Sequence, residues 1–248
     1  GLRNNFNVSG LIDRVVGIEA IETRGISILS NTIQNLTGVS SAQSNQSYPV
    51  KGIQLVNGSF ANVSVSSQVS GNTIRNLSNL ATIGSANVCG IFINSVAAST
   101  YEVARNFIHS FQLTSSTSTS QVAGIVLQEG ESRLVNNMIR LGINGSGQSV
   151  ALPTSFVGID VNSSAGSTLW HNSVYIGGTL ANSASSTYAL RRNGNGAVAL
   201  VNNVLVNQRT FTIGTVKRNF VIGLSSSAFF TSSNNCYFRS GNGTGLSE

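Results

Sequence analysis

Few residues in this sequence could carry out catalysis, and most of them stand alone. The 248 residues include eight Asp or Glu, two His and two Cys. The best-placed carboxylates are Glu129 and Glu131, which an extended backbone would separate by roughly 6–7 Å, within the range of inverting glycosidases. Two solvated acids in a turn explain this pair more simply, so we expect no catalytic residue.

Other reactive constellations are incomplete. His109 and His171 have no third ligand near them, which argues against a metal site, and no acid beside either His completes a Ser-His-acid triad. The glycine-rich segment 142–147 is not followed by a helical sequence, unlike a phosphate-binding loop. Cys89 and Cys236 lack a metal-binding or redox spacing. We therefore expect neither a metal nor a cofactor.

The charge balance argues against nucleic acid and against a membrane span. The net charge of +6 comes from 14 basic and 8 acidic residues, so acids are scarce rather than bases abundant. The arginines are scattered, with Arg191 and Arg192 as the only adjacent Arg pair, whereas nucleic-acid binders gather basic residues into a patch. No apolar run reaches the ~18 residues of a membrane-spanning helix.

Two short phrases recur along the chain. The first reads apolar, any residue, Asn, any residue, apolar, although Ser stands first in two of its copies. It is anchored at Asn4, Asn31, Asn72, Asn106, Asn137, Asn172, Asn203 and Asn235. The second phrase, Gly followed by alternating apolar residues, precedes most of these anchors, as in 52–55, 90–93, 124–127 and 158–161. A fixed order of two phrases identifies a tandem array.

The repeat unit indicates an all-β protein. Its apolar segments are short, alternate with period two and are rich in β-branched residues, which favours strands over helices. Each unit holds too few strands for a propeller blade and too little Leu for a leucine-rich repeat. We predict one right-handed parallel β-helix over residues 1–248, with about eight coils and a period of about 31–35 residues. We also expect it to be a fragment of a longer chain with further domains.

The Asn column has a structural explanation. Asn tolerates the left-handed backbone conformation of a sharp corner, and stacked Asn amides can hydrogen-bond from coil to coil. The predicted ladder comprises Asn31, Asn72, Asn106, Asn137, Asn172, Asn203 and Asn235.

Residues two positions after each anchoring Asn are apolar in every copy, so we expect an inward stack. This stack comprises Phe6, Ile33, Ile74, Ile108, Ile139, Val174, Leu205 and Tyr237. The Gly phrase contributes two more inward stacks, with the pairs Ile53/Leu55, Ile91/Ile93, Ile125/Leu127 and Ile159/Val161. Only neighbouring coils can bury such side chains.

One outward column has binding character. Three positions after the anchoring Asn lie Arg75, His109, Arg140 and Tyr175, and Phe107 lies beside them. Because the guanidinium fork suits carboxylates and sulfates, we expect this column to contact an acidic polysaccharide or an anionic partner.

Two pairwise contacts also follow from the coil alignment. Asp160 and Arg191 should form a surface ion pair on adjacent coils. Cys89 and Cys236 should lie four coils apart, at about 19 Å, so both should be free because a disulfide requires Cα atoms within ~7 Å.

The C-terminal third resembles a known repeat. The segments Trp170–Thr179, Tyr188–Arg192 and Val201–Thr210 are similar to the pattern HNSVYIGG, YALRR, VNNIFVNERT of large secreted and surface β-helix proteins of Bacteroidota. The resemblance implies export of the type IX secretion kind, a location outside the cell or on its surface, and an adhesive or carbohydrate-related role. A cell-surface or secretion-machinery protein is then a possible partner.

The leading function is a non-catalytic extracellular module, structural or adhesive. The alternative is a carbohydrate-active enzyme of the β-helix class, a polysaccharide lyase or glycosidase, which would require clustered carboxylates. An ice-binding solenoid would need a flat Thr array that the irregular outward columns lack. A polymerising protein with open ends is a fourth reading, although truncation of a longer chain explains uncapped ends more simply.

The inward stacks give a first prediction. Replacing Ile108 or Ile125 with Asp should cost several kcal/mol of stability, because the change buries an unpaired charge. Thermal unfolding measures this, and a variant with an unchanged melting temperature would contradict the inward assignment.

Overall fold

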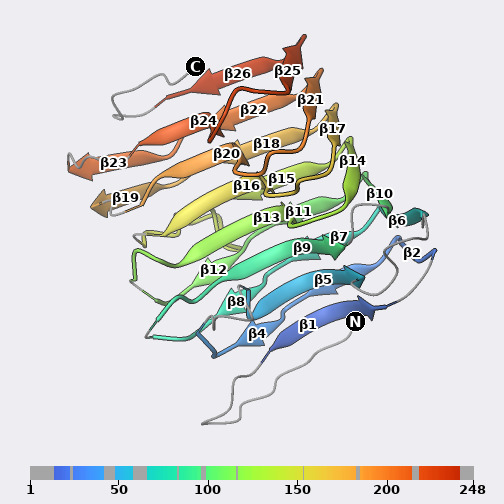
Figure 1. The fold of residues 1–248 in the computed structure, drawn as a ribbon. Helices are drawn as coiled ribbons and strands as arrows, with labels where there is room; N and C mark the ends of the chain where they lie inside the picture. Colours follow the sequence, from blue (N-terminus) through green and yellow to red (C-terminus); the bar gives the residue numbers. More distant parts are fainter. Residues whose placement is uncertain are drawn as a thin grey trace.

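The chain forms a parallel β-helix in the computed structural model. The described residues are 14–22, 25–41, 48–57, 66–82, 84–95, 99–115, 117–152, 154–182, 185–213 and 218–240, and their regular elements are strands, without a helix. Within these ranges there is accordingly no helical segment long and apolar enough to cross a membrane. The strands stack in sequence order along one axis (Figure 1).

Three seven-stranded sheets form the walls, and all of their strand pairs are parallel. Sheet A contains β1 (Val15–Ile21), β5 (Val50–Asn57), β9 (Val88–Ser95), β13 (Gln121–Leu127), β16 (Ser155–Val161), β20 (Thr187–Arg192) and β24 (Asn219–Leu224). Sheet B contains β2 (Ser27–Leu29), β6 (Ser66–Ser70), β10 (Thr100–Ala104), β14 (Glu131–Val135), β17 (Ser167–Trp170), β21 (Val198–Val201) and β25 (Phe230–Ser233). Sheet C contains β3 (Thr32–Gln34), β7 (Thr73–Arg75), β11 (Phe107–His109), β15 (Met138–Leu141), β18 (Ser173–Ile176), β22 (Val204–Asn207) and β26 (Cys236–Arg239).

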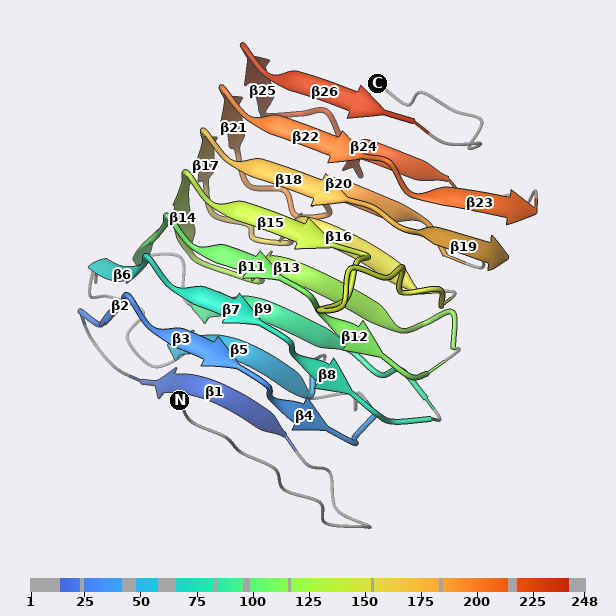
Figure 2. The same cartoon turned by 180° about the vertical axis from the view of Figure 1, so that it is seen from behind.

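Two smaller parallel sheets extend sheet C on the side seen in Figure 2. They contain β4 (Thr37–Gly38), β8 (Ser78–Asn79) and β12 (Gln112–Leu113) in one case, and β19 (Thr179–Asn182) and β23 (Thr210–Ile213) in the other. Seven strands per main sheet give about six full turns from the first strand to the last. The sequence predicts about eight coils, but the segment of Asn4 and Phe6 lies outside the described residues.

The predicted Asn ladder is present, and its amides are saturated with hydrogen bonds. Nδ2 of Asn137, which is 0% exposed, donates to Oδ1 of Asn172 (2.9 Å) and to the Val103 carbonyl (2.8 Å). Its Oδ1 accepts from Nδ2 (2.9 Å) and the backbone N–H (3.1 Å) of Asn106. Amide-to-amide bonds of 2.9–3.0 Å join Asn31, Asn72, Asn106, Asn137, Asn172, Asn203 and Asn235 in that order.

The left-handed corner, however, falls one residue earlier than predicted. Positive φ angles of 54–69° occur at Ser30, Gly71, Arg105, Asn136, His171, Asn202 and Asn234, and not at the ladder residues. The left-handed residue turns the chain between sheets B and C, and the next residue can then direct its amide into the corner. The ladder Asn is thus selected for its hydrogen bonds, and the residue before it carries the unusual backbone.

The predicted inward stacks form the core. Ile74, Ile108, Ile125 and Leu205 are at most 1% exposed. Tyr237 is the exception at 43% exposed, because β26 is an edge strand without a neighbour on its outer side.

Glycine in the second phrase is required by close packing between sheets A and C. A Cβ atom on Gly90 would lie 2.7 Å from Cγ2 of Ile108, and one on Gly52 would lie 2.5 Å from Cγ2 of Ile74. These distances are shorter than carbon–carbon contacts permit. In the coil of β20 the position is Ala189, and the corresponding sheet C residue is Leu205, which lacks a β-branch. The two sequence phrases are therefore halves of one packing arrangement.

The ladder gives a second prediction. Asn137→Ala should cost about 2–4 kcal/mol, because the buried Oδ1 of Asn172 loses one of its two donors, the Val103 carbonyl loses the Nδ2 donor, and the Asn106 amide and backbone N–H lose their acceptor. The control is Asn136→Gly, which alters the exposed left-handed neighbour and should leave stability unchanged or slightly higher. Equal unfolding midpoints for the Asn137 variant and the parent protein would refute the assignment.

Candidate functional site

The residues predicted to bind a ligand lie together on the outer face of sheet C. Arg75, His109, Arg140 and Tyr175 occupy successive strands in direct register, and Phe107 occupies the adjacent column. We call these five residues the sheet C strip. Arg75 and Arg140 are two strands apart, which separates their Cα atoms by about 9–10 Å.

Hydrogen bonds hold the cationic side chains on this face. Nε of Arg75 donates to Oε1 of Gln34 (2.8 Å), and Nη2 of Arg140 donates to Oγ of Ser110 (3.3 Å). The same Ser110 hydroxyl lies 2.7 Å from Nδ1 of His109. Partial burial, followed by the nearby Arg140 and Arg75, lowers the pKa of His109, so this imidazole is neutral at pH 7. The strip therefore has two cations with a neutral imidazole between them.

An apolar column runs beside the cations. Phe107 is 39% exposed and stacks on His109 with ring centroids 4.3 Å apart. Met138 and Val204, in the same column as Phe107, are 54% and 43% exposed. The strands of sheet C contain no Asp or Glu, so within the described residues the face combines positive charge with exposed apolar surface.

The two carboxylates that the sequence suggested as a pair lie in different surroundings. Oε2 of Glu129 accepts hydrogen bonds from the backbone N–H (3.1 Å) and hydroxyl (2.8 Å) of Ser164 on the next coil. Glu131 begins β14 and lies near Glu102 on the outer face of sheet B. His109 lies on sheet C and His171 at the ladder corner, and the described part of the chain holds no group of three potential metal ligands.

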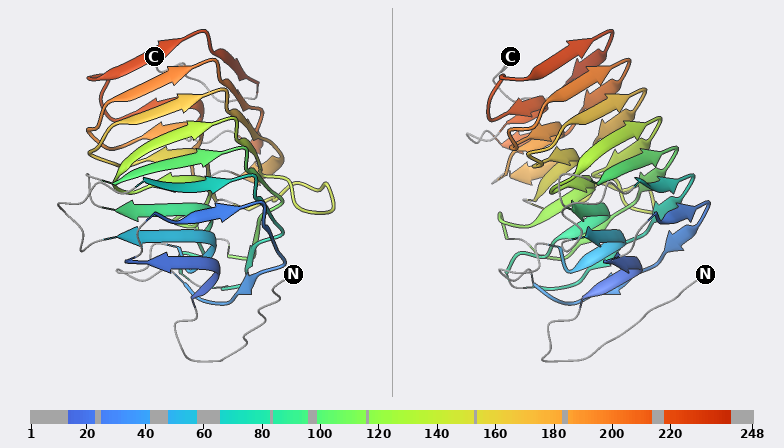
Figure 3. Two further views of the ribbon diagram at one scale, coloured as in Figure 1. Left: turned by 90° about the vertical axis from the view of Figure 1, so that its right-hand side faces the viewer. Right: turned by 45° about the vertical axis from the view of Figure 1, so that its right-hand side comes forward.

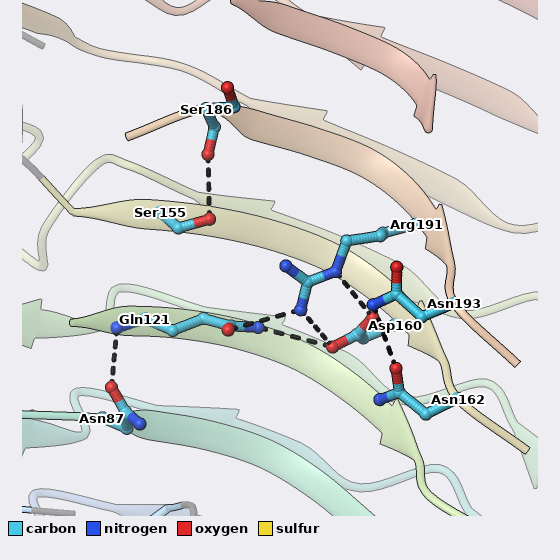
Figure 4. A network of polar contacts seen from close by, with 8 residues as sticks. All are labelled: Asn87, Gln121, Ser155, Asp160, Asn162, Ser186, Arg191 and Asn193. Carbon is cyan, nitrogen blue, oxygen red and sulfur yellow. Dashed lines mark hydrogen bonds and ion pairs between the residues drawn. The ribbon is translucent and has the colours of Figure 1, made fainter. Parts of the chain in front are cut away.

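A second polar cluster lies on the outer face of sheet A (Figure 4). Arg191 forms a bidentate pair with Asp160, with Nη2–Oδ2 of 2.6 Å and Nε–Oδ1 of 2.9 Å. Gln121 bridges the pair, because its amide donates to Asp160 (3.4 Å) and accepts from Arg191 (3.3 Å).

The predicted ion pair between Asp160 and Arg191 is confirmed, but the expected surface position is wrong. The Asp160 side chain is only 2% exposed, since Gln121 and Arg191 cover it. Each Asp160 oxygen already has a partner, so this cluster ties three coils together and leaves no open ligand position at Asp160.

Two arginines that the sequence did not identify as structural are buried and donate hydrogen bonds to backbone carbonyls. We call them the buried clamps. Arg192 lies in the inward column that continues from Val161, and it donates to the carbonyls of Gly196 and Ser226. Arg209, 0% exposed, donates to the carbonyls of Gly177 (3.0 Å) and Val150 (2.7 Å).

Burial of these clamps limits the charge available at the surface. Desolvation lowers the pKa of Arg209 to about 10, so it remains charged at pH 7. Its guanidinium lies 4.4 Å from the Phe156 ring centroid. Arg192 aligns with the inward residues Leu127 and Val161 of the two preceding coils, and this alignment in the sequence would have identified Arg192 as buried. Both clamps belong to the segments that carried the resemblance.

The third buried cation is Lys51, which faces outward from sheet A beside Cys89. Lys51 is 3% exposed, donates to the Tyr48 carbonyl, and lies 5.3 Å from the Phe92 ring centroid. Desolvation lowers its pKa to about 8. Burial likewise raises the pKa of the Cys89 thiol, which keeps it protonated. Cys89 and Cys236 are both free, as predicted.

Comparison of the chain with protein-family models, curated proteins and solved structures found no match in any of the three.

Lys51 gives a third prediction, in which stability depends on pH. Its pKa is lower in the folded chain than in the unfolded chain, so the unfolded state binds more protons between about pH 8 and 10.5 and stability rises with pH there. Lys51→Met should raise stability by about 1–3 kcal/mol at pH 7, where the cost of the buried charge is fully present. Denaturant unfolding at several pH values measures this, and a variant whose advantage persisted above pH 10.5 would contradict it.

Proposed function

We propose that this chain is a non-catalytic extracellular β-helix module that binds an acidic polysaccharide through the sheet C strip. The observation that carries the proposal is the direct register of Arg75, His109 and Arg140 on a sheet whose strands contain no carboxylate. The resemblance of residues 170–210 to secreted and surface β-helix proteins supports a location outside the cell.

The geometry suits a linear anionic polymer better than a compact anion. The Cα atoms of Arg75 and Arg140 lie about 9–10 Å apart, and Arg75 donates to Gln34 on the strand beyond it, so the two guanidinium groups can contact successive charged groups along an extended chain. Phe107 and Tyr175 add aromatic surface on which the apolar faces of sugar rings can pack. An acidic cell-surface protein would use the same positive charge and is a second possible partner.

Two of the carboxylates have structural partners and lie away from the sheet C strip. The Asp160 carboxylate is occupied by Arg191, and the Glu129 carboxylate by Ser164. Neither lies on sheet C, where the proposed ligand binds.

A fourth prediction tests this function. On an array of sulfated and uronic-acid oligosaccharides, the protein should bind, and Arg75→Ala combined with Arg140→Ala should weaken binding at least about ten-fold. Binding should also weaken as salt is added, because exposed charges are screened.

The control variant combines Arg14→Ala with Arg218→Ala, which removes the same charge from exposed positions outside sheet C. It should retain nearly all of the affinity. Equal losses in the two double variants would indicate nonspecific attraction to net charge. Unchanged binding by the Arg75/Arg140 variant, or an array without acidic ligands, would overturn the proposal.

A further inference from the structure

A groove on the outer face of sheet B has chemistry different from that of the sheet C strip. Its volume is about 220 Å³, below the roughly 300–1,000 Å³ of pockets for drug-sized ligands, so it suits one sugar residue of a longer chain. It crosses β6, β10, β14 and β17. These strands lie along the right-hand edge of Figure 1, the side that is turned toward the viewer in the left panel of Figure 3. Its lining residues are Ser66, Thr100, Tyr101, Glu102, Glu131, Ser132, Arg133 and Thr168.

The charged side chains in the groove are held apart from one another. Glu102 and Arg133 face each other across β10 and β14, where an ion pair would be expected. Instead, Glu102 Oε1 accepts from Gln68 Nε2 (3.3 Å), and the Arg133 guanidinium lies 4.5 Å from the Trp170 ring centroid. Among the described contacts, no ion pair joins Arg133 to Glu102 or Glu131. Acceptor and donor groups therefore remain available on the adjacent strands β10 and β14.

The indole beside the groove supplies an apolar surface. Trp170 ends β17 and is the only Trp in the chain. It lies on the strand next to that of Arg133 and two residues further along, since Arg133 pairs with Thr168 and Val135 pairs with Trp170. Stacking by Arg133 fixes the indole at the margin of the groove.

The charged groups and the indole together restrict the chemistry of a ligand that can bind in the groove. Carboxylates only accept hydrogen bonds and guanidinium only donates them, so a ligand that meets Glu102, Glu131 and Arg133 together must carry adjacent groups that do both. Sugar hydroxyls have this property, and the C–H face of a sugar ring matches an indole. Two carboxylates against one guanidinium disfavour an anionic chain.

We propose that this groove is a binding subsite for a neutral polysaccharide, separate from the sheet C strip. The two surfaces lie on either side of the Asn ladder, since the chain passes from Trp170 on sheet B through Asn172 to Ser173 on sheet C. The module accordingly has one face for a polyanion and one for uncharged glycan.

The single tryptophan makes the test direct. Intrinsic fluorescence of the full chain is recorded while neutral hexasaccharides of glucose, mannose, xylose or N-acetylglucosamine are added to millimolar concentrations. At least one should give a saturable change in Trp170 emission. Glu102→Gln combined with Glu131→Gln should weaken that binding at least about ten-fold, whereas Glu129→Gln, outside the groove, should change it less than about two-fold.

The variants separate this proposal from the proposed function. Arg75→Ala combined with Arg140→Ala should leave the fluorescence response intact, and the Glu102/Glu131 variant should retain acidic-glycan binding. Because Glu102 and Glu131 point outward, the double variant should keep the parent melting temperature, which excludes unfolding as the cause. No saturable response to any of the neutral hexasaccharides, a response only to acidic ones, or full binding by the Glu102/Glu131 variant would overturn the proposal.

Discussion

The hydrogen bonds between stacked Asn amides are the constraint on which the structure depends. In the five interior ladder amides, Asn72, Asn106, Asn137, Asn172 and Asn203, both amide protons donate and Oδ1 accepts two hydrogen bonds within a buried corner, so only Asn meets the requirement at that place. Asp would remove the donors, and Ala would leave neighbouring groups unpaired. The ladder fixes how one coil sits on the next, and both the inward stacks and the outward columns inherit their register from it.

Packing between sheets A and C reinforces that register. Five Gly residues of sheet A each accommodate a β-branched side chain of sheet C at a distance that excludes a methyl group, as at Gly90 and Ile108; they are Gly17, Gly52, Gly90, Gly124 and Gly158. A slip of one residue would bring a side chain into the space that Gly leaves open and would move the apolar set to the outside. Hydrogen bonding at the corner and steric fit across the interior thus specify the same alignment, and the outward residues of sheets B and C lie in straight columns as a result.

The sequence predicted the features that repeat, together with the Asp160–Arg191 ion pair, and missed most of the contacts that occur once. Periodic Asn and Ile residues identified the ladder and the core because the same packing arrangement repeats in every coil. The corner was misplaced by one residue because Asn136 and Asn137 are the same residue type in different conformations. Burial of Asp160 and Arg209 depends on side chains and segments from other coils, which no single repeat encodes. The groove residues Glu102 and Arg133 could have been aligned, since both stand four residues before a ladder Asn.

The polarity of the ladder has a consequence for how such a chain can change in length. In the amide-to-amide bonds, each Asn donates to the following coil and each interior Asn accepts from the preceding one, so each coil offers the same pair of faces to its neighbours. Duplication or loss of the gene segment for one whole coil would therefore restore matching faces at the junction. Insertions shorter than one coil could be accommodated only in the segments between the strands. The spacing of successive ladder residues varies in this way, from 41 residues in one coil to 31 in another. Recombination in units of one coil would thus allow this architecture to lengthen or shorten without a change in the packing of its core.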